Sequence, residues 1–413
     1  MFKFRSTIAT AVIVASASLS LAACDDSPTE PGTVEIVIGG LFGLTGSWAT
    51  LGQNAKAALE MAVADLNEHF EDNAAGIVFA ARVEDTQLEP SRALQQAQLL
   101  AASGVRIMIG PQASSEVAEL KSFVDSNGIL LVSPSSTAGA LAVPNDNVFR
   151  FTPSDGPEGT AVAALMWDDG VAAVVPVWRQ DAGNAGLEAA TRSAFSALGG
   201  TVLQGVSYAA STTNFAATAT ALAAQVQSAI DEHGLESVAV YLAAFDEVVD
   251  LFKAASTIPV LSSVRWYGSD GVALSDALLS DDDAADFAIE VGYPNPLFGL
   301  EEGASDIWAP LSARIQAITG LEPDAFALAV YDAAWVAARA AIAAGGAGNI
   351  NALKAAFVAT AANHFGATGW TVLNAAGDRR YGNFDFWAIR AVGGVNRWTR
   401  VAQYETQTGR LIR

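Results

Sequence analysis

Residues 107–132 read IMIGPQASSEVAELKSFVDSNGILLV, and the sequence continues as SPSSTAGA through residue 140. A short apolar run ends at Gly110-Pro111 and a polar step follows. Apolar residues then recur at helical spacing until Asn127-Gly128, after which a second apolar run begins. This order predicts a strand, a Ser-rich turn, a helix, a second strand, and a second Ser/Thr-rich turn at residues 133–137. Repetition of such units is typical of parallel sheets covered by helices.

The two turns predict a binding site for a small carboxylate. In open parallel sheets, ligands bind outside the carboxyl ends of the strands, which is where both turns fall. Ser114 and Ser115 stand at the start of the predicted helix, so their hydroxyls and the free N–H groups could hold an anion without a basic side chain. Alternatively the serines only cap the helix, and the two roles are compatible. Thr137 could donate to the same carboxylate or merely close its turn.

The rest of the chain repeats the alternation of strand and helix. Strands are predicted at 34–38, 77–83, 171–177, 202–208, 238–242 and 264–267, and helices at 51–67, 91–103, 157–167, 186–198, 215–233 and 246–255. The pattern starts again after Pro153, which predicts a second lobe with its own parallel sheet. Further helices are predicted at 307–319, 325–344 and 350–360, and a turn at residues 374–378 is predicted to join antiparallel strands at 370–373 and 384–389.

We therefore predict an α/β protein with two Rossmann-like lobes joined by a hinge. The N-terminal lobe is expected to comprise residues 34–152 and about 296–366, and the C-terminal lobe residues 153–295 and about 367–413. About 380 residues follow the N-terminal segment, which is too many for one core and suits two lobes.

The first residues have the features of a secretion signal. Lys3 and Arg5 precede an apolar stretch that is too short to cross a membrane comfortably. Leu-Ala-Ala-Cys at residues 21–24 resembles a bacterial lipobox, although an ordinary secretory signal with an incidental cysteine is the alternative. We expect residues 1–23 to be a signal peptide and residues 24–33 to hold a lipidated Cys24 and a flexible linker. This predicts location in the periplasm or at the cell surface, with the membrane reached through the lipid only.

Composition argues against several classes of function. The chain has a formal charge of −22, from 22 basic and 44 acidic residues, which disfavours binding to nucleic acid or anionic lipid. Its three histidines lack metal-ligand spacing, and it has neither a G-x-S-x-G elbow nor a phosphate-binding P-loop. Cys24 is the only cysteine. We therefore expect no enzyme, no metal and no cofactor.

Two further residues extend the predicted site. Trp48 lies in a Gly-rich segment between the first strand and helix, and it could wall a pocket or pack within its own lobe. Asp270 follows a strand of the second lobe within YGSDG, where it could pair with a ligand ammonium or serve only as a turn residue. Hydroxyl and N–H groups from one lobe and a carboxylate from the other would together clamp an amino acid.

These motifs, in this order, resemble those of the type I periplasmic binding proteins, closest to the leucine/isoleucine/valine-binding receptors of ABC transporters. The segments that carry the resemblance are IGGLFGLTGSWATLGQNAKAALEMAVADLNE, VRIMIGPQASSEVAE, ILLVSPSSTAG, VFRFTPSDGPEG, YGSDG and FGATGWTVLNAAGDRRYGNFDFWAIR. The likeness covers residues 34 to about 400. It implies the two-lobed type I fold and a ligand bound between the lobes.

The resemblance also implies roles for individual residues at the head group of an amino acid. Ser114 matches a serine whose hydroxyl and N–H hold the ligand carboxylate, and Ser135 a position that offers backbone contacts. Thr137 matches a threonine that contacts both ends of the head group. Asp270 falls where the family uses an acidic residue, usually Glu, for the ammonium. Tyr241 or its neighbour falls near an aromatic that lines the second lobe.

Two departures concern the ligand side chain. The family often has Tyr-Gly after the first strand of the second lobe, where this chain has Ala182-Gly183, and Trp178 lies nearby to compensate. Leu51 falls where relatives carry an aromatic, with Trp48 three residues earlier. We expect these four positions, 48, 51, 178 and 182, to contribute to the ligand site, and its ligand to differ in bulk from those of relatives.

The resemblance implies a monomeric extracytoplasmic lipoprotein that captures an amino acid or similar small zwitterion for an ABC permease. The lobes would close around the ligand. The alternative is a sensory module of the same fold that signals to a partner without transport.

Overall fold

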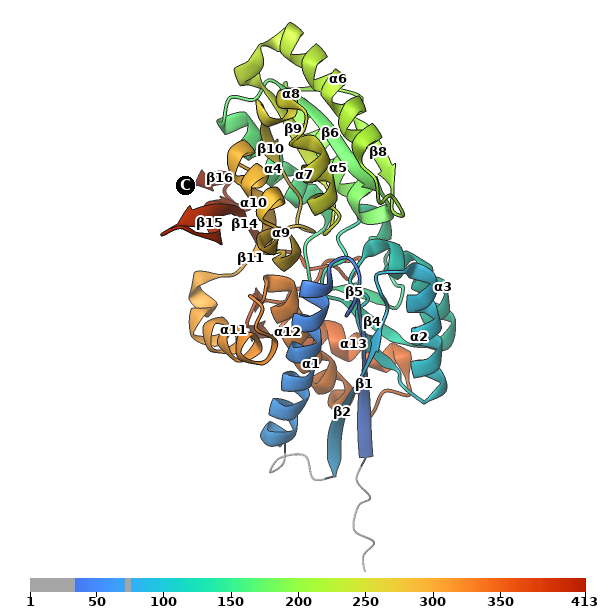
Figure 1. Ribbon diagram of the computed structural model, residues 1–413. Coiled ribbons are helices and arrows are strands. Elements are labelled where there is room, and N and C mark those ends of the chain that lie inside the picture. The colour runs from blue at the N-terminus through green and yellow to red at the C-terminus, as the bar shows by residue number, and fades with distance from the viewer. Residues whose placement is uncertain (1–33, 71–75) are drawn as a thin grey trace, which may run out of the picture.

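The protein consists of two α/β lobes with a waist between them (Figure 1). A computed structural model describes residues 34–70 and 76–413. The expected signal peptide, Cys24 and linker lie outside these residues. The N-terminal lobe is the lower one in Figure 1, and the C-terminal lobe is the upper one.

The N-terminal lobe is built on a five-stranded parallel sheet with the order β2-β1-β3-β4-β5. Its strands are β1 (Val34–Phe42), β2 (Ile77–Asp85), β3 (Ile107–Ile109), β4 (Leu130–Ser133) and β5 (Val148–Arg150). The central strands β3 and β4 are buried along their whole length, as expected of a parallel sheet with helices on both faces. Their register pairs Ile109 with Val132, so the two Ser-containing turns emerge side by side at one edge.

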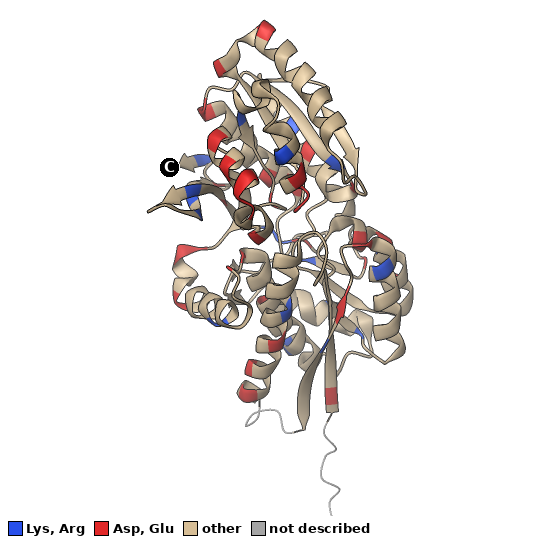
Figure 2. Ribbon diagram, viewed as in Figure 1, with Lys and Arg blue, Asp and Glu red and all other residues tan. Residues whose placement is uncertain are grey.

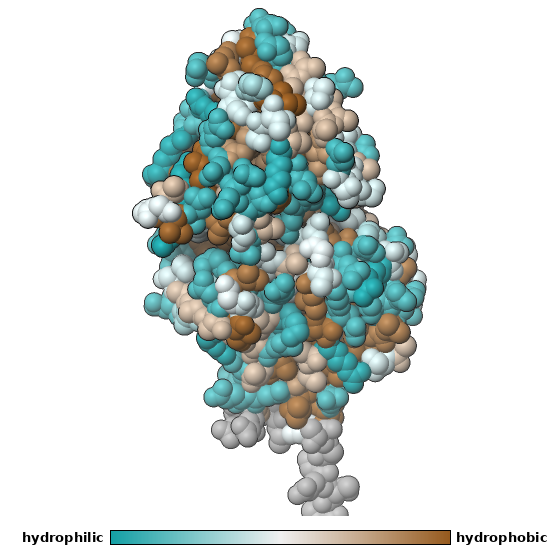
Figure 3. All heavy atoms as spheres, viewed as in Figure 1, coloured by the Kyte–Doolittle hydropathy of each residue, from teal (hydrophilic) through white to brown (hydrophobic). Residues whose placement is uncertain are grey.

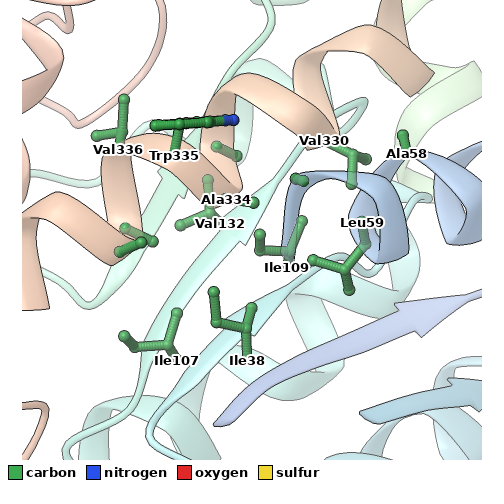
Figure 4. Close-up of a cluster of buried hydrophobic side chains, with 14 of the residues drawn as sticks. Ile38, Ala58, Leu59, Ile107, Ile109, Val132, Val330, Ala334, Trp335 and Val336 are labelled. Carbon is green, nitrogen blue, oxygen red and sulfur yellow. The ribbon is translucent and has the colours of Figure 1, made fainter. Parts of the chain in front are cut away.

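Helices cover both faces of this sheet. One face carries α1 (Ala49–Phe70), α11 (Ser305–Thr319), α12 (Ala325–Ala343) and α13 (Ile350–Ala361), and the other α2 (Pro90–Ala102) and α3 (Ser114–Asn127). Figure 4 shows the core between β1, β3, β4 and the helices α1 and α12, where small residues such as Ala58 and Ala334 allow close packing. Helix α12 is apolar enough to cross a membrane by length and composition, yet 78% of its most apolar window is buried in this core. We therefore regard it as a core helix.

The C-terminal lobe repeats this plan. Its parallel sheet has the order β10-β9-β6-β7, and β8 also pairs with β6. The strands are β6 (Ala173–Gln180), β7 (Thr201–Val202), β8 (Val206–Ala209), β9 (Val238–Ala243) and β10 (Arg265–Tyr267). The single strand predicted at 202–208 is wrong: β7 and β8 are separated at Gly205, whose φ is +81° and where an added Cβ would lie 2.3 Å from the Pro176 carbonyl oxygen.

The second sheet is also covered on two sides. Helices α4 (Asp155–Asp168) and α5 (Ala182–Ala197) pack on one face, and α6 (Ala216–His233), α7 (Val248–Ala255), α8 (Pro259–Ser262) and α10 (Asp282–Val291) on the other. The short α9 (Asp276–Ser280) precedes α10, and three single-turn 3₁₀ helices lie at Gly139–Leu141, Leu235–Ser237 and Glu302–Ala304. The prediction of an α/β fold with two parallel-sheet cores is confirmed.

The C-terminal part of the chain differs from its prediction. Strand β14 (Asn383–Val392) pairs with β11 (Asn295–Gly299) and β15 (Val395–Glu405), and β15 pairs with β16 (Arg410–Ile412). A separate two-stranded sheet is formed by β12 (Phe365–Gly366) and β13 (Gly369–Trp370). The predicted pairing of 370–373 with 384–389 is therefore wrong, although Leu373 does bridge Arg379 around the predicted turn.

The division between lobes also differs in detail from the expected boundaries near 296 and 366. Residues 295–299 extend the antiparallel sheet of the C-terminal lobe, because β11 needs β14 as its hydrogen-bonding partner. Residues up to 379 stay on the N-terminal sheet, because Arg150 and Asp378 form a parallel bridge at the edge of β5. Acidic residues are spread over both lobes (Figure 2), and hydrophilic residues cover much of the face seen in Figure 3.

Candidate ligand-binding site

A small cavity lies between the lobes at the carboxyl ends of the parallel strands. Its volume is about 10 Å³, which is room for about one water molecule, so the lobes are closed around little space. Its lining includes the five predicted residues Trp48, Ser114, Ser135, Thr137 and Asp270. The remaining lining residues are Ala113, Gly183, Asn184, Leu187 and Phe245. Both lobes contribute, as expected because ligands of open parallel sheets bind outside the carboxyl ends of the strands.

Ser114 is arranged to donate a hydrogen bond into the cavity. Its Oγ accepts hydrogen bonds from Ser136 Oγ at 3.0 Å and from the Ala138 N–H at 3.1 Å. A hydroxyl has two acceptor sites and one hydrogen, so both acceptor sites are used and the hydrogen is left to point elsewhere. Ser114 also begins the 14-residue helix α3, whose first N–H groups carry partial positive charge. This end of the cavity suits an anion.

The next two predicted residues offer backbone or acceptor groups. Ser135 Oγ donates to the Gln112 carbonyl oxygen at 3.0 Å, so its hydroxyl hydrogen is not available to a ligand. Thr137 faces Asp155: its carbonyl oxygen accepts from the Asp155 N–H at 2.9 Å, and its side chain counteracts the rise in the pKa of that carboxyl. This contact joins the second turn of the N-terminal lobe to the start of α4.

A buried ion pair holds the second turn in place. Arg150 Nε lies 2.6 Å from Asp378 Oδ1, and both side chains are almost completely buried. Arg150 Nη1 also donates to the carbonyl oxygens of Ala138 at 2.7 Å and Ser136 at 3.3 Å. Sequence reasoning missed this support, because Arg150 and Asp378 are 228 residues apart in the sequence.

The C-terminal lobe presents carboxyl groups. Asp270 is 4% exposed, and its backbone N–H donates to Glu158 Oε1 at 3.2 Å. The two carboxyl groups lie within hydrogen-bonding reach of each other. Burial, together with the nearby Asp155, raises the pKa of Asp270 to about 8. In residues 34–70 and 76–413, no ion pair includes Asp270 or Glu158, so this end of the cavity lacks a positive partner.

Small residues let helix α5 approach the anion end. An added Cβ at Gly183 would lie 3.6 Å from Ser114 Oγ, and one at Gly186 would lie 2.2 Å from Asp155 Oδ2. Asp181 caps the helix by accepting from the Asn184 N–H at 2.9 Å, and Asn184 Nδ2 donates to the other carboxylate oxygen at 2.9 Å. The first turn of α5 therefore forms the wall opposite Ser114.

Trp48 joins the two lobes on the apolar side of the cavity. Its ring lies 4.7 Å from that of Phe245 in the other lobe and 6.1 Å from Phe326 in its own, measured between centroids. Its backbone N–H donates to Asp246 Oδ2 at 2.7 Å, and the other oxygen of that carboxylate accepts from Ser275 Oγ at 2.6 Å. Trp48 adopts a φ of +67°, which is strained for a bulky residue and is held by these contacts.

Four predicted residues do not line the cavity. Leu51 is buried in the apolar cluster beside Trp48, and Trp178 is half-buried at the end of β6. Ala182 is exposed at the start of α5, where Gly183 and Asn184 face the cavity in its place. Tyr241 is fully buried in β9, near Glu158 and Asp270, and burial raises the pKa of its hydroxyl.

Sequence reasoning missed several residues at the site. Phe245 follows the carboxyl end of β9 and Asn184 that of β6. The sequence analysis could therefore have found both from their positions after parallel strands. Leu187 faces inward one turn into α5. Glu158 lies within the predicted helix at 157–167, and the helical pattern alone does not show that its side chain points towards Asp270.

Comparisons with known proteins agree with this fold. The family model described as receptor family ligand binding region matches residues 54–391. An uncharacterised protein of Methanocaldococcus jannaschii is 31% identical over 407 residues, which is 94% of each chain. The branched-chain amino acid transporter substrate binding protein LivJ of Streptococcus pneumoniae, solved with isoleucine, has a TM-score of 0.72 at 20% identity, over 89% of this chain and 99% of that one.

A second solved structure extends the range of bound ligands. The solute binding protein of an ABC transporter from R. palustris, solved with benzoate, has a TM-score of 0.72 at 19% identity, over 89% of this chain and 96% of that one. These likenesses show the fold, and the family model covers most of the chain. The chain therefore belongs to the receptor family ligand binding region, as a type I periplasmic binding protein similar to the branched-chain amino acid binding proteins.

Proposed function

We propose that this protein captures an amino acid or similar small zwitterion between its lobes and delivers it to an ABC importer. The observation that carries the proposal is the polarity of the cavity. Ser114 and the start of α3 present hydrogen-bond donors at one end, and Asp270 presents at the other a carboxyl that forms no ion pair within the described residues. A ligand with a carboxylate and an ammonium satisfies both ends, and charge-assisted hydrogen bonds are strong where water is excluded.

The cavity is narrow in this closed form. Its volume of about 10 Å³ lies far below the ~300–1,000 Å³ of typical ligand pockets, so the lobes must open to admit a ligand. Trp48, Phe245 and Leu187 supply apolar contact for a short side chain. The isoleucine and benzoate in the two solved relatives share a carboxylate, which matches the donor end of the cavity.

We further propose that Cys24 is lipidated after removal of residues 1–23 and anchors the protein outside the cytoplasm. The support is the Leu-Ala-Ala-Cys motif after a short apolar stretch. A Cys24→Ala variant should stay in the soluble extracytoplasmic fraction, whereas the native chain should remain with membranes. Equal distribution of both forms would contradict the anchor.

Isothermal titration calorimetry tests the ligand. Residues 34–413 would be titrated at pH 8 with the common L-amino acids, and with benzoate and acetate as carboxylates that lack an ammonium. We expect heat and a Kd in the micromolar range or below for at least one small amino acid, and weaker binding for the simple carboxylates. Tighter binding of the carboxylates, or no binding by any amino acid, would contradict the proposal.

A further inference from the structure

Glu158 is a fully buried carboxyl group that the proposed function does not use. It is 1% exposed on α4 and contacts Asp270, which lines the cavity, whereas Glu158 itself does not. Its Oε1 accepts from the Asp270 N–H at 3.2 Å, and the two carboxyl groups are within hydrogen-bonding reach. Two ionised carboxylates at this distance would repel strongly in a buried site.

The groups around Glu158 do not supply a counter-charge. Asp270 faces it from the loop after β10, Tyr241 from β9 and Asp155 from its own helix. On α5, the facing helix, Glu188 and Arg192 pair with each other at 2.6 Å.

The effects on the pKa agree with this environment. Burial, then the charges of Asp270 and Asp155, raise the pKa of Glu158 well above its usual range. Burial also raises the pKa of Asp270, while the hydrogen bond from Glu158 opposes that rise. Of the two groups, Glu158 therefore keeps its proton.

We propose that Glu158 is a positioning residue that acts as a neutral acid: it donates its hydrogen to the Asp270 carboxylate and so leaves a single negative charge for the ligand. Glu158 would then contact Asp270 twice, because its Oε1 accepts from the Asp270 backbone N–H and its hydroxyl donates to the Asp270 side chain. One negative charge matches a ligand with one ammonium, such as a zwitterionic amino acid, and disfavours a diamine. The statement on the ligand rests on the proposed function, whereas the protonation of Glu158 does not.

A Glu158→Gln variant separates a neutral acid from a second charge. An amide can accept from the Asp270 N–H through its oxygen and donate through its nitrogen, so it reproduces the neutral acid and can never ionise. A Glu158→Met variant fills similar space without any donor. A Glu236→Gln variant is the matched control, because Glu236 is exposed in the same lobe.

The first measurement needs no ligand. A group whose pKa is raised in the folded state stabilises the fold below its unfolded pKa, and this contribution is lost as pH rises towards the folded pKa. The melting temperature of Glu158→Gln relative to the native protein should therefore rise between pH 5 and pH 8, by about 2 °C per pH unit. The Glu236→Gln difference should stay constant. A flat difference for Glu158→Gln would overturn the proposal.

The second measurement uses L-leucine as the probe in calorimetry at pH 8. Glu158→Gln should bind within about threefold of the native protein, and Glu158→Met should lose tenfold or more, because a hydrogen bond to a charged group is lost. Equal losses in both variants would mean that Glu158 acts as a charge, and would overturn the proposal. If no amino acid binds to the native protein, the proposed function fails, and the melting curves still decide the state of Glu158. If Glu158→Gln does not fold, infrared spectra of native protein labelled with ¹³C-glutamate take its place. A Glu158 carboxyl that is ionised at pH 7 in these spectra would overturn the proposal.

Discussion

The two lobes share a fold but contribute opposite chemistry to the cavity. The N-terminal lobe offers neutral donors, the Ser114 hydroxyl and the N–H groups at the start of α3. The C-terminal lobe offers carboxyl groups, Asp270 backed by Glu158. Each lobe uses the carboxyl edge of its parallel sheet, so the difference lies in which side chains follow the strands. The contrast implies that a bound zwitterion has one orientation, with its carboxylate towards the N-terminal lobe.

The largest expected effect comes from removing the charge of the C-terminal lobe. Asp270→Asn should weaken binding of amino acids about 100-fold or more, since a buried charge pair contributes ~2–5 kcal/mol. Simple carboxylates should lose little. Calorimetry with both ligand classes measures this, and Asp276→Asn, at an exposed acid of the same lobe, is the control. Equal losses for both ligand classes would remove the assigned role of Asp270.

A pH series tests the same contrast without a mutation. Because the pKa of Asp270 is about 8, the empty site holds a proton below that pH and an ammonium must displace it. Amino-acid affinity should therefore fall as pH decreases from 8 to 6, by up to about tenfold per unit. The affinity of simple carboxylates should not fall in this way. An amino-acid Kd that is constant from pH 6 to pH 9 would contradict the assignment.

Changing the N-terminal lobe should affect all carboxylate ligands alike. Ser114→Ala removes one donor at the anion end and should raise the Kd about tenfold for amino acids and simple carboxylates, because a hydrogen bond to a charged group contributes ~1.5–3 kcal/mol. Ser115→Ala, next to it and outside the cavity lining, should change the Kd less than threefold. If Ser114→Ala reduces only amino-acid binding, the proposed orientation is reversed.

The smallest effect is expected where the lobes meet without the ligand. Asp246→Ala removes the contact to the Trp48 N–H and should favour the open form, raising every Kd about threefold to tenfold. Small-angle X-ray scattering should show a larger radius of gyration for the ligand-free variant than for the native protein. An unchanged radius together with an unchanged Kd would show that this bond does not hold the lobes together.

The fold was predictable where burial imposes a strong pattern. Strands such as β3 and β4 are apolar throughout because helices cover both faces of their sheet. Strand β15 was missed because most of its side chains are partly or fully exposed, so its polar residues weaken the alternating signal. The pairing of β14 with β11 could not be read from the sequence, because it joins segments almost 90 residues apart.

The site was predictable where its residues directly follow the carboxyl ends of parallel strands. Ser114 and Asp270 follow parallel strands, and the structure brings both to one cavity. Glu158 and Leu187 lie inside helices, and which side chains of a helix point towards the site depends on how the helix packs on its neighbours. Ala182 was predicted to line the site but is exposed, and its neighbour Gly183 lines the cavity. The sequence pattern located this segment but not the exact residue.

The ion pair between Arg150 and Asp378 has a consequence for how the protein matures. The turn that carries Ser136 and Ala138 depends on a carboxylate encoded 228 residues downstream, and α12 completes the same lobe from the far end of the chain. The first lobe to leave a ribosome or a translocon is thus the last to be finished. A chain truncated before residue 378 would lack the carboxylate that pairs with Arg150, so its N-terminal lobe would stay incomplete.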